Sequence, residues 1–277
     1  MISVIVPAHN EEAVIGRCLT ALLEGARPGE LEAIVACNGC SDRTAERARS
    51  FGPPVRVIEI EQASKTAAIN AAERLVTAFP RLYVDADVEL QLRGVRAVAA
   101  ALGSGVLASP VAETDLGPAS PAVRAFYAIW LSLPYNQVMV GTGVYALSEE
   151  GRARFGEFPP VIADDGFVRS LFRPEDRIAV PEAIVRVVAP RTLRDLVRVA
   201  TRVRQGIYQL RTRQPDGRVT DQKNILSILQ SLPKSFALPW QMMVYLSVNF
   251  VVRIRARWAR MYGYERQWYR DDAARVF

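Results

Sequence analysis

The motif with the clearest chemical meaning is Asp85-Ala86-Asp87, which places two carboxylates on either side of one residue. Mg²⁺ and Mn²⁺ favour carboxylate oxygens, and Mg²⁺ is commonly bound by one or two carboxylates together with substrate phosphates. Lys65 offers a positive charge to the same phosphates. The pattern favours a site for Mn²⁺ or Mg²⁺ held by Asp87 and Asp85. The open alternative is that Asp85 only caps the following helix.

A second acidic pair, Asp164-Asp165, precedes a helix that we predict at residues 167–172. A carboxylate at a helix N-terminus is stabilised in its ionised form, which suits a general base that removes a proton from a hydroxyl. Ordinary capping is again the alternative. Two successive aspartates exceed what capping needs, so we expect this pair to be catalytic.

Histidine and cysteine usage excludes several other sites. The only histidine is His9, so a multi-histidine zinc site is excluded. Three cysteines are too few for a disulfide framework, and Cys37-x-x-Cys40 lacks the second pair that a zinc site needs. The phosphate-loop motif G-x-x-x-x-G-K-[ST] does not occur in the sequence, which excludes a P-loop ATPase.

The elements that position these residues alternate along the chain. Strands are predicted at residues 3–7, 33–37, 55–60 and 81–84, and helices at 11–23, 42–50 and 65–77. Such alternation is typical of an α/β fold with a mostly parallel sheet and helices on both faces. Ligands of these sheets bind at the carboxyl ends of the strands, where four loops here bring amide, lysine and carboxylate groups.

The remainder of the chain comprises a region of both strands and helices, followed by a helical region. Further strands are predicted at 106–111, 141–147 and 184–188, with a helix at 122–131, and the pattern from residue 191 onward is helical and basic. We therefore predict an α/β catalytic domain over residues 1–190 and a basic helical extension over 191–277.

Five blocks of sequence, taken in order, resemble a family 2 glycosyltransferase with the GT-A fold. The blocks are V-I-V-P-A-H-N-E-E, N-G-C-S-D-R-T, K-T-A-A-I-N-A, Y-V-D-A-D and A-D-D. The resemblance covers roughly residues 1–190. It implies inverting transfer of a sugar from a nucleoside diphosphate sugar, of UDP or GDP type, to an acceptor hydroxyl. It also implies a divalent metal on the pyrophosphate and no covalent enzyme intermediate.

The resemblance also implies roles for individual residues. Asp165 would be the general base, with Asp164 beside it in place of a glutamate. Asp87 would bind the metal, and Asp85 the metal or the donor ribose. The remaining donor-binding residues would be Pro7, Ala8, Asn10, Glu11, Asn38 and Lys65.

Two departures from the family pattern bear on specificity. Asn38 stands where the family usually has an aspartate that accepts from uracil, so a UDP sugar is less firmly implied. The Q-x-x-R-W motif of processive synthases is degraded to Thr201-Arg202-Val203 and its neighbours. We therefore expect a single transfer rather than polymerisation.

A rival prediction comes from Gly141-Thr142-Gly143-Val144-Tyr145-Ala146, which matches the dinucleotide fingerprint G-x-G-x-x-A. A nicotinamide-dependent oxidoreductase would use this turn. Against it, residues 144–147 are predicted as a strand, whereas the fingerprint needs a helix there.

Charge is distributed unevenly along the chain. Residues 186–277 hold 18 lysines and arginines against 6 acidic residues, whereas residues 1–185 hold 17 against 23. An apolar run at 236–252 is followed at once by arginines, and it is short for a membrane span. It predicts either a buried helix or an interfacial helix on an anionic membrane, where a lipid-linked acceptor would be met. No nucleic-acid-binding motif is present.

The N-terminus bears on location. It has no basic segment before its short apolar run, which is unlike a secretory signal. We expect a cytoplasmic protein, with peripheral contact at the inner face of the cell membrane.

Overall fold

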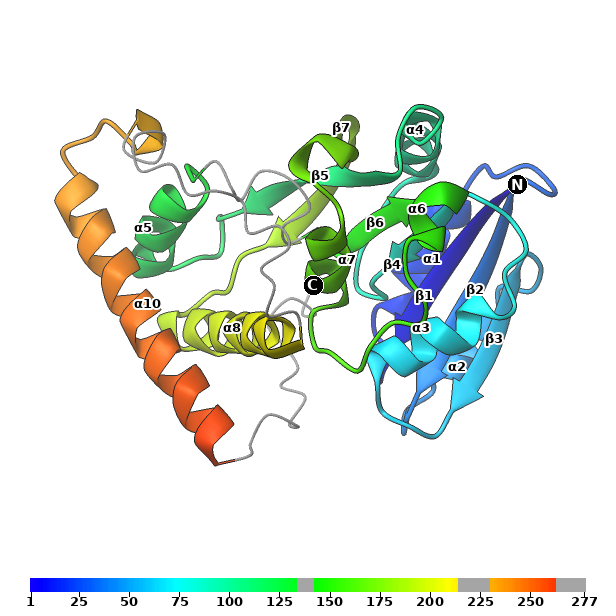
Figure 1. Ribbon diagram of the computed structural model, residues 1–277, viewed down its shortest axis with the longest axis horizontal. Helices are drawn as coiled ribbons and strands as arrows, with labels where there is room; N and C mark the ends of the chain where they lie inside the picture. The colour runs from blue at the N-terminus through cyan, green and yellow to red at the C-terminus, as the bar shows by residue number, and fades with distance from the viewer. Residues whose placement is uncertain (134–141, 214–229, 263–277) are drawn as a thin grey trace. The chain divides into compact units, whose positions relative to one another are not determined.

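The computed structural model describes residues 1–133, 142–213 and 230–262. It divides into two compact units (Figure 1). The first unit comprises Met1–Glu113 and Val138–Arg186, and the second comprises Thr114–Gln137 and Val187–Phe277. The segment Thr114–Gln137, predicted to be part of the first domain, thus groups with the basic C-terminal region.

A seven-stranded sheet of order β3-β2-β1-β4-β6-β5-β7 forms the centre of the fold. Its strands are β1 (Ile2–Ala8), β2 (Leu31–Asn38), β3 (Val55–Ile60), β4 (Arg81–Val84), β5 (Leu107–Asp115), β6 (Val144–Leu147) and β7 (Arg177–Val188). Strands β1 to β4 pair in parallel, whereas β6 is antiparallel to both β4 and β5. The predicted mostly parallel α/β sheet is confirmed, and β6 makes the sheet mixed.

The helices of the first unit follow the predicted alternation. They are α1 (Ile15–Leu23), α2 (Thr44–Arg49), α3 (Lys65–Glu73), α4 (Leu92–Ala101), α6 (Glu149–Ala153) and α7 (Asp164–Leu171), with a short 3-10 turn, η2 (Pro174–Asp176). Helix α1 buries Ile15, Cys18, Leu19 and Leu22, which recur at three- and four-residue spacing and so form one apolar face. Helix α4 was not predicted.

The strand order identifies where a ligand should bind. From β1 the chain steps outward to β2 and β3, and then returns across β1 to β4. Because β-α-β crossovers are right-handed, this reversal places α3 on the opposite face of the sheet from α1 and α2. The reversal lies between β1 and β4, and crevices at such switch points bind ligands beside the carboxyl ends of the strands.

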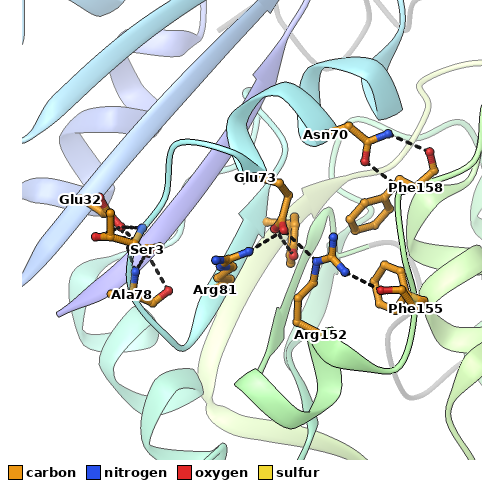
Figure 2. A network of polar contacts seen from close by, with 11 residues as sticks. Ser3, Glu32, Asn70, Glu73, Ala78, Arg81, Arg152, Phe155 and Phe158 are labelled. Carbon is orange, nitrogen blue, oxygen red and sulfur yellow. Dashed lines mark hydrogen bonds and ion pairs between the residues drawn. The ribbon is translucent and has the colours of Figure 1, made fainter.

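A buried polar network fixes α3 against the sheet (Figure 2). The Glu73 carboxylate at the end of α3 accepts from Arg81 of β4 at 2.6 Å and from Arg152 of α6 at 2.8 Å. The hydroxyl of Tyr83 donates to the same carboxylate at 2.6 Å. Since the carboxylate is compensated by two guanidinium groups, it can remain charged in the interior.

The second unit packs α5 (Pro121–Trp130) and α8 (Leu193–Arg213) against α10 (Leu238–Met261), as Figure 1 shows. Helix α10 buries one stripe at four-residue spacing, made by Val244, Val248, Val252 and Ala256. Large apolar side chains elsewhere on α10 are exposed, including Trp240, Met243, Leu246, Phe250 and Trp258. None of the helices within the described ranges combines the length and apolar character that crossing a bilayer requires.

Candidate active site

Lys65 joins the two acidic motifs at the switch point. It is the first residue of α3, after Ser64, whose hydroxyl accepts from the backbone N–H of Ala67. The Lys65 ammonium lies 2.6 Å from Oδ1 of Asp85 and 2.7 Å from Oδ1 of Asp164. These three residues form a lysine–aspartate cluster that brings together a helix start, a strand end and a second helix start.

Asp164 is held on two sides. Its side chain is only 2% exposed, and besides Lys65 it accepts from the hydroxyl of Tyr145 at 3.0 Å. Tyr145 lies on β6 and stacks on Tyr83 of β4, with ring centroids 4.6 Å apart. Tyr83 in turn donates to Glu73, so a continuous chain of contacts links the cluster to the network of Figure 2. Asp164 is thus fixed in position.

The electrostatics of the cluster follow from burial and proximity. Burial lowers the pKa of Lys65, but the charges of Asp164 and Asp85 outweigh it and hold the pKa well above its ordinary value. Burial raises the pKa of Asp85 to about 6, and Asp164 and Asp87 add to the rise while Lys65 opposes it. The pKa of Asp165 is likewise raised, chiefly by burial and then by the charge of Asp164. Lys65 is therefore a fixed cation among closely spaced carboxylates.

The outer member of each acidic pair is more open than the inner one. Asp87 is exposed, whereas Asp85 is half-buried. Asp165 is half-buried, and its Oδ1 accepts from the backbone N–H of Gly166 at 2.7 Å. The two pairs are built alike: one aspartate contacts Lys65, and the next is more accessible.

The oxygen ligands of the D-x-D turn suit a divalent cation but supply only part of its coordination. Among residues 1–133, 142–213 and 230–262, no three histidine, cysteine, aspartate or glutamate side chains are grouped to hold a metal. A half-buried carboxylate next to an exposed one, Asp85 and Asp87, matches the manner in which Mg²⁺ binds with substrate phosphates. A cation here would thus need phosphate oxygens to complete its coordination.

The loop after β1 and the loop after β2 are joined by hydrogen bonds. Asn10 adopts a left-handed backbone conformation with φ of 54°, which asparagine tolerates better than most residues. Its side-chain oxygen accepts from the backbone N–H of Ser41 at 2.7 Å. The backbone N–H of Glu11 donates to the hydroxyl of Thr44 at 2.7 Å. Asn10 and Glu11 therefore shape these loops, and their contact with a donor stays a prediction.

Three other predicted donor-binding residues lie deeper. Pro7, Ala8 and Asn38 are buried, and the amide NH₂ of Asn38 donates to the carbonyl of Ala8 at 2.8 Å. The imidazole Nδ1 of His9 lies 2.5 Å from the backbone carbonyl oxygen of Asn38. The Asn38 side chain is thus committed to holding the two strand ends together. Its role in base recognition stays a prediction.

The glycine turn that suggested an oxidoreductase belongs to this same site. Gly141 lies outside the described residues, but Gly143 has a φ of 62° and precedes β6, a strand rather than the helix that the fingerprint needs. Its carbonyl accepts from the backbone N–H of Asp85 at 2.8 Å. A Cβ on Gly143 would lie 3.1 Å from Oδ2 of Asp85 and 2.8 Å from Val88, so glycine is needed for the D-x-D turn to pack here.

Tyr145 was not predicted as a site residue. A tyrosine within a strand is ordinary, so nothing local marks it as part of a site. The only available signal was its position two residues after Gly143.

The site and fold agree with the comparison to known protein families. Residues 3–111 match the model of glycosyl transferase family 2. The chain carries a glycosyltransferase family 2 domain. Comparison with curated proteins gives no match.

The solved structures that resemble this glycosyltransferase share its fold. The mannosyltransferase PcManGT from Pyrobaculum calidifontis, in complex with GDP-Man and Mn²⁺, is 22% identical with a TM-score of 0.62, over 95% of this chain and 79% of that one. Glucosyl-3-phosphoglycerate synthase from Mycobacterium tuberculosis, in complex with Mn²⁺, UDP and glucosyl-3-phosphoglycerate, is 23% identical with a TM-score of 0.57, over 77% and 79% of the two chains. At these identities the likeness establishes the GT-A fold.

Proposed function

We propose that this glycosyltransferase transfers one sugar, with inversion, from a nucleoside diphosphate sugar of UDP or GDP type to an acceptor hydroxyl. The observation that carries the proposal is the meeting of Lys65, Asp85 and Asp164 at the switch point of the sheet. A fixed cation next to the carboxylates of Asp85 and the more exposed Asp87 suits a diphosphate bound with a divalent metal. The structural relatives, solved in complex with GDP-Man or UDP and with Mn²⁺, support this donor class.

Asp87 and Asp85 would hold Mn²⁺ or Mg²⁺ together with the donor phosphates. The chemistry that the cation supplies when bound is neutralisation of the charge that develops on the leaving diphosphate. Lys65 contributes a second positive charge near Asp85, and the Asp164 contact keeps its ammonium in place.

The two aspartates at the start of α7 have different roles in this proposal. Asp164 is buried and saturated by Lys65 and Tyr145, so it positions the lysine. Asp165 is more open and has a raised pKa, which brings a carboxylate closer to the strength that a general base needs. Asp165 takes the proton of the acceptor hydroxyl as the hydroxyl oxygen attacks the anomeric carbon opposite the leaving group. One displacement of this kind inverts the configuration.

The second unit supports a membrane-bound acceptor. The outward side chains of α10 include Phe250 at 65% and Trp258 at 62% exposure, and no acidic residue occurs in the helix. An apolar face with arginines beside it suits the interface of an anionic bilayer. The proposed location is therefore peripheral, on the inner face of the cell membrane, with a lipid-linked acceptor.

Donor binding can be tested by thermal shift with UDP, GDP, dTDP and NAD(H), each with and without Mn²⁺. We expect one nucleoside diphosphate to raise Tm only when metal is present, and Asp87→Asn to lose this rise. Glu89→Gln is the matched control, because it removes an exposed carboxylate, paired with Arg17, from the same loop. A rise with NAD(H) alone, indifferent to metal, would contradict the transferase and favour the oxidoreductase.

The membrane contact has its own test. Replacing both Leu246 and Phe250 by serine should reduce co-sedimentation with vesicles that contain phosphatidylglycerol. Ile184→Ser removes an apolar side chain of similar exposure from β7 and should change nothing. Equal binding by all three proteins would overturn the assignment of this face.

A further inference from the structure

The helices α8 and α10 carry an excess of positive charge. Helix α8 contains six arginines and one acidic residue, Asp195, and α10 contains four arginines and no acidic residue. Asp195 pairs with Arg198 near the start of α8, at 3.6 Å. The arginines further along α8 and those of α10 therefore have no other acidic residue within these two helices.

Arg204 lies where the two helices meet. Its guanidinium is half-buried and donates to the side-chain oxygen of Asn249 at 3.4 Å. The amide NH₂ of Asn249 donates in turn to the carbonyl of Tyr245 at 2.9 Å, which fixes that orientation. The Arg204 side chain is thus anchored to α10 by a neutral group.

Two more arginines lie on the same sides of the helices. Arg211 follows Arg204 by two turns of α8, and Arg253 follows Asn249 by one turn of α10. We call these four residues, Arg204, Arg211, Arg253 and Asn249, the arginine seam. In the part of the chain that the structure describes, no ion pair joins a seam arginine to a carboxylate.

The seam is electrostatically unfavourable without an anion. Burial lowers the pKa of Arg204, and the positive charges of Arg253 and Arg211 lower it further. A half-buried cation that faces other cations costs free energy unless an opposite charge compensates it. Guanidinium groups match the oxygens of a phosphate group in pairs of parallel hydrogen bonds, which makes phosphate a well-suited anion.

We propose that the arginine seam binds a phosphate group, carried either by an anionic lipid head group or by a soluble phosphate compound. The inference deepens the proposed membrane contact, on which its lipid source rests. It is independent of the sugar transfer, because every residue of the seam belongs to the second unit.

The first arm of the test uses inorganic phosphate and the full chain. At matched ionic strength, a phosphate concentration about ten times Kd should raise Tm by about 3 °C relative to chloride. Arg204→Gln should raise Tm in chloride, because it removes the repelled cation, and should lose the response to phosphate. Arg198→Gln, on the same helix but paired with Asp195, should keep the response. Phosphate bound at Lys65 would leave both variants equally responsive.

The second arm identifies the source of the phosphate. Vesicles of phosphatidylcholine with and without phosphatidic acid should distinguish wild type from Arg204→Gln only if the lipid head group is the ligand. A loss of the phosphate response without a change in vesicle binding assigns a soluble ligand. If Arg204→Gln and Arg198→Gln behave alike in both arms, the proposal is overturned. Neither arm contains a donor sugar, so failure here leaves the proposed transfer intact.

Discussion

In the first unit the central buried charges have partners of opposite sign, whereas the helices of the second unit present arginines with few partners and apolar side chains in the open. Glu73 is compensated by two arginines, and Lys65 by two aspartates. In the second unit, Arg204 is anchored to an amide and repelled by its neighbours.

This difference indicates that the two units have different functions. The first unit holds its own charges in fixed positions, as a site must that acts on a charged donor. The second unit leaves positive charge and apolar surface without complement in the described chain, as a surface does that meets an anionic, partly apolar partner. Substitutions should therefore have opposite signs of effect in the two units.

The largest effect on stability should come from Glu73→Gln. Removing this carboxylate leaves the guanidinium groups of Arg81 and Arg152 buried without a counter-charge, which should lower the free energy of unfolding by about 3–5 kcal/mol. Chemical denaturation measures the change. The control Glu157→Gln breaks an exposed pair with Arg74 and should cost less than about 1 kcal/mol.

The contrast between the two units would be contradicted if substitutions at the Glu73 network and at Arg204 changed stability in the same direction. Glu73→Gln should destabilise the protein, whereas Arg204→Gln should stabilise it in chloride. A destabilisation of similar size in both variants would mean that Arg204 is as well compensated as Arg81.

The next effect concerns turnover rather than stability. Asp165→Asn should lower kcat at least about 10²-fold, because it removes the proposed base, and should leave donor binding and Tm nearly unchanged. Asp176→Asn is the control, since it removes an aspartate that pairs with Arg154 outside the site. Loss of donor affinity in a folded Asp165→Asn protein would contradict the base role.

Sequence patterns predicted the parts of this molecule that depend on local order. Because parallel strands deliver their carboxyl ends to one edge, the positions of Lys65 and Asp85 after successive strands predicted that they would be close. The structure confirms this and adds Asp164.

The remainder depends on contacts that local periodicity does not encode. Strand β6 enters antiparallel beside β4, which is why Tyr145 reaches Asp164. Helix α5 contacts α10, more than a hundred residues further along the chain, so the grouping of Thr114–Gln137 with the C-terminal helices could not be read from either segment alone. Helix α4 does carry the expected periodicity, since Leu92, Val95 and Val98 form a buried apolar face, so its pattern was readable from the sequence and was missed.

A smaller effect should distinguish the two stacked tyrosines. Burial and the charge of Asp164 hold the pKa of Tyr145 well above its ordinary value, so its hydroxyl remains a donor to Asp164. Tyr145→Phe should free Asp164 on one side, loosen Lys65, and lower kcat about tenfold with little change in Tm. Tyr83→Phe keeps the stack but loses the bond to Glu73, so it should lower Tm and spare kcat.

The opposite pattern would reassign the stack. Suppose that Tyr83→Phe lowers kcat as much as Tyr145→Phe does. Either substitution would then disturb the site through the stacked rings, and the hydroxyl of Tyr145 would have no separate positioning role.

The smallest effect should appear in acid, and it sharpens the contrast between the units. Burial raises the pKa of Glu32, but hydrogen bonds from Ser3, Thr77 and Ala78 outweigh it, so the net pKa lies below the ordinary 4.5. Figure 2 shows Ser3 and Ala78 beside Glu32. A carboxylate with a depressed pKa stabilises the fold above pH 4.5, and this contribution is lost as the pH falls through its native pKa.

Glu32→Gln should therefore cost about 1 kcal/mol at pH 7 and flatten the fall of stability below pH 4.5. Arginines keep their charge throughout this range, so the response of the arginine seam to phosphate should be the same in the variant and in wild type. An unfolding titration in acid for both proteins measures the first claim, and the phosphate shift at neutral pH measures the second. If Glu32→Gln altered the phosphate response, the charges of the two units would be coupled. The compensated charges of the first unit and the arginine seam of the second could then not be treated as independent.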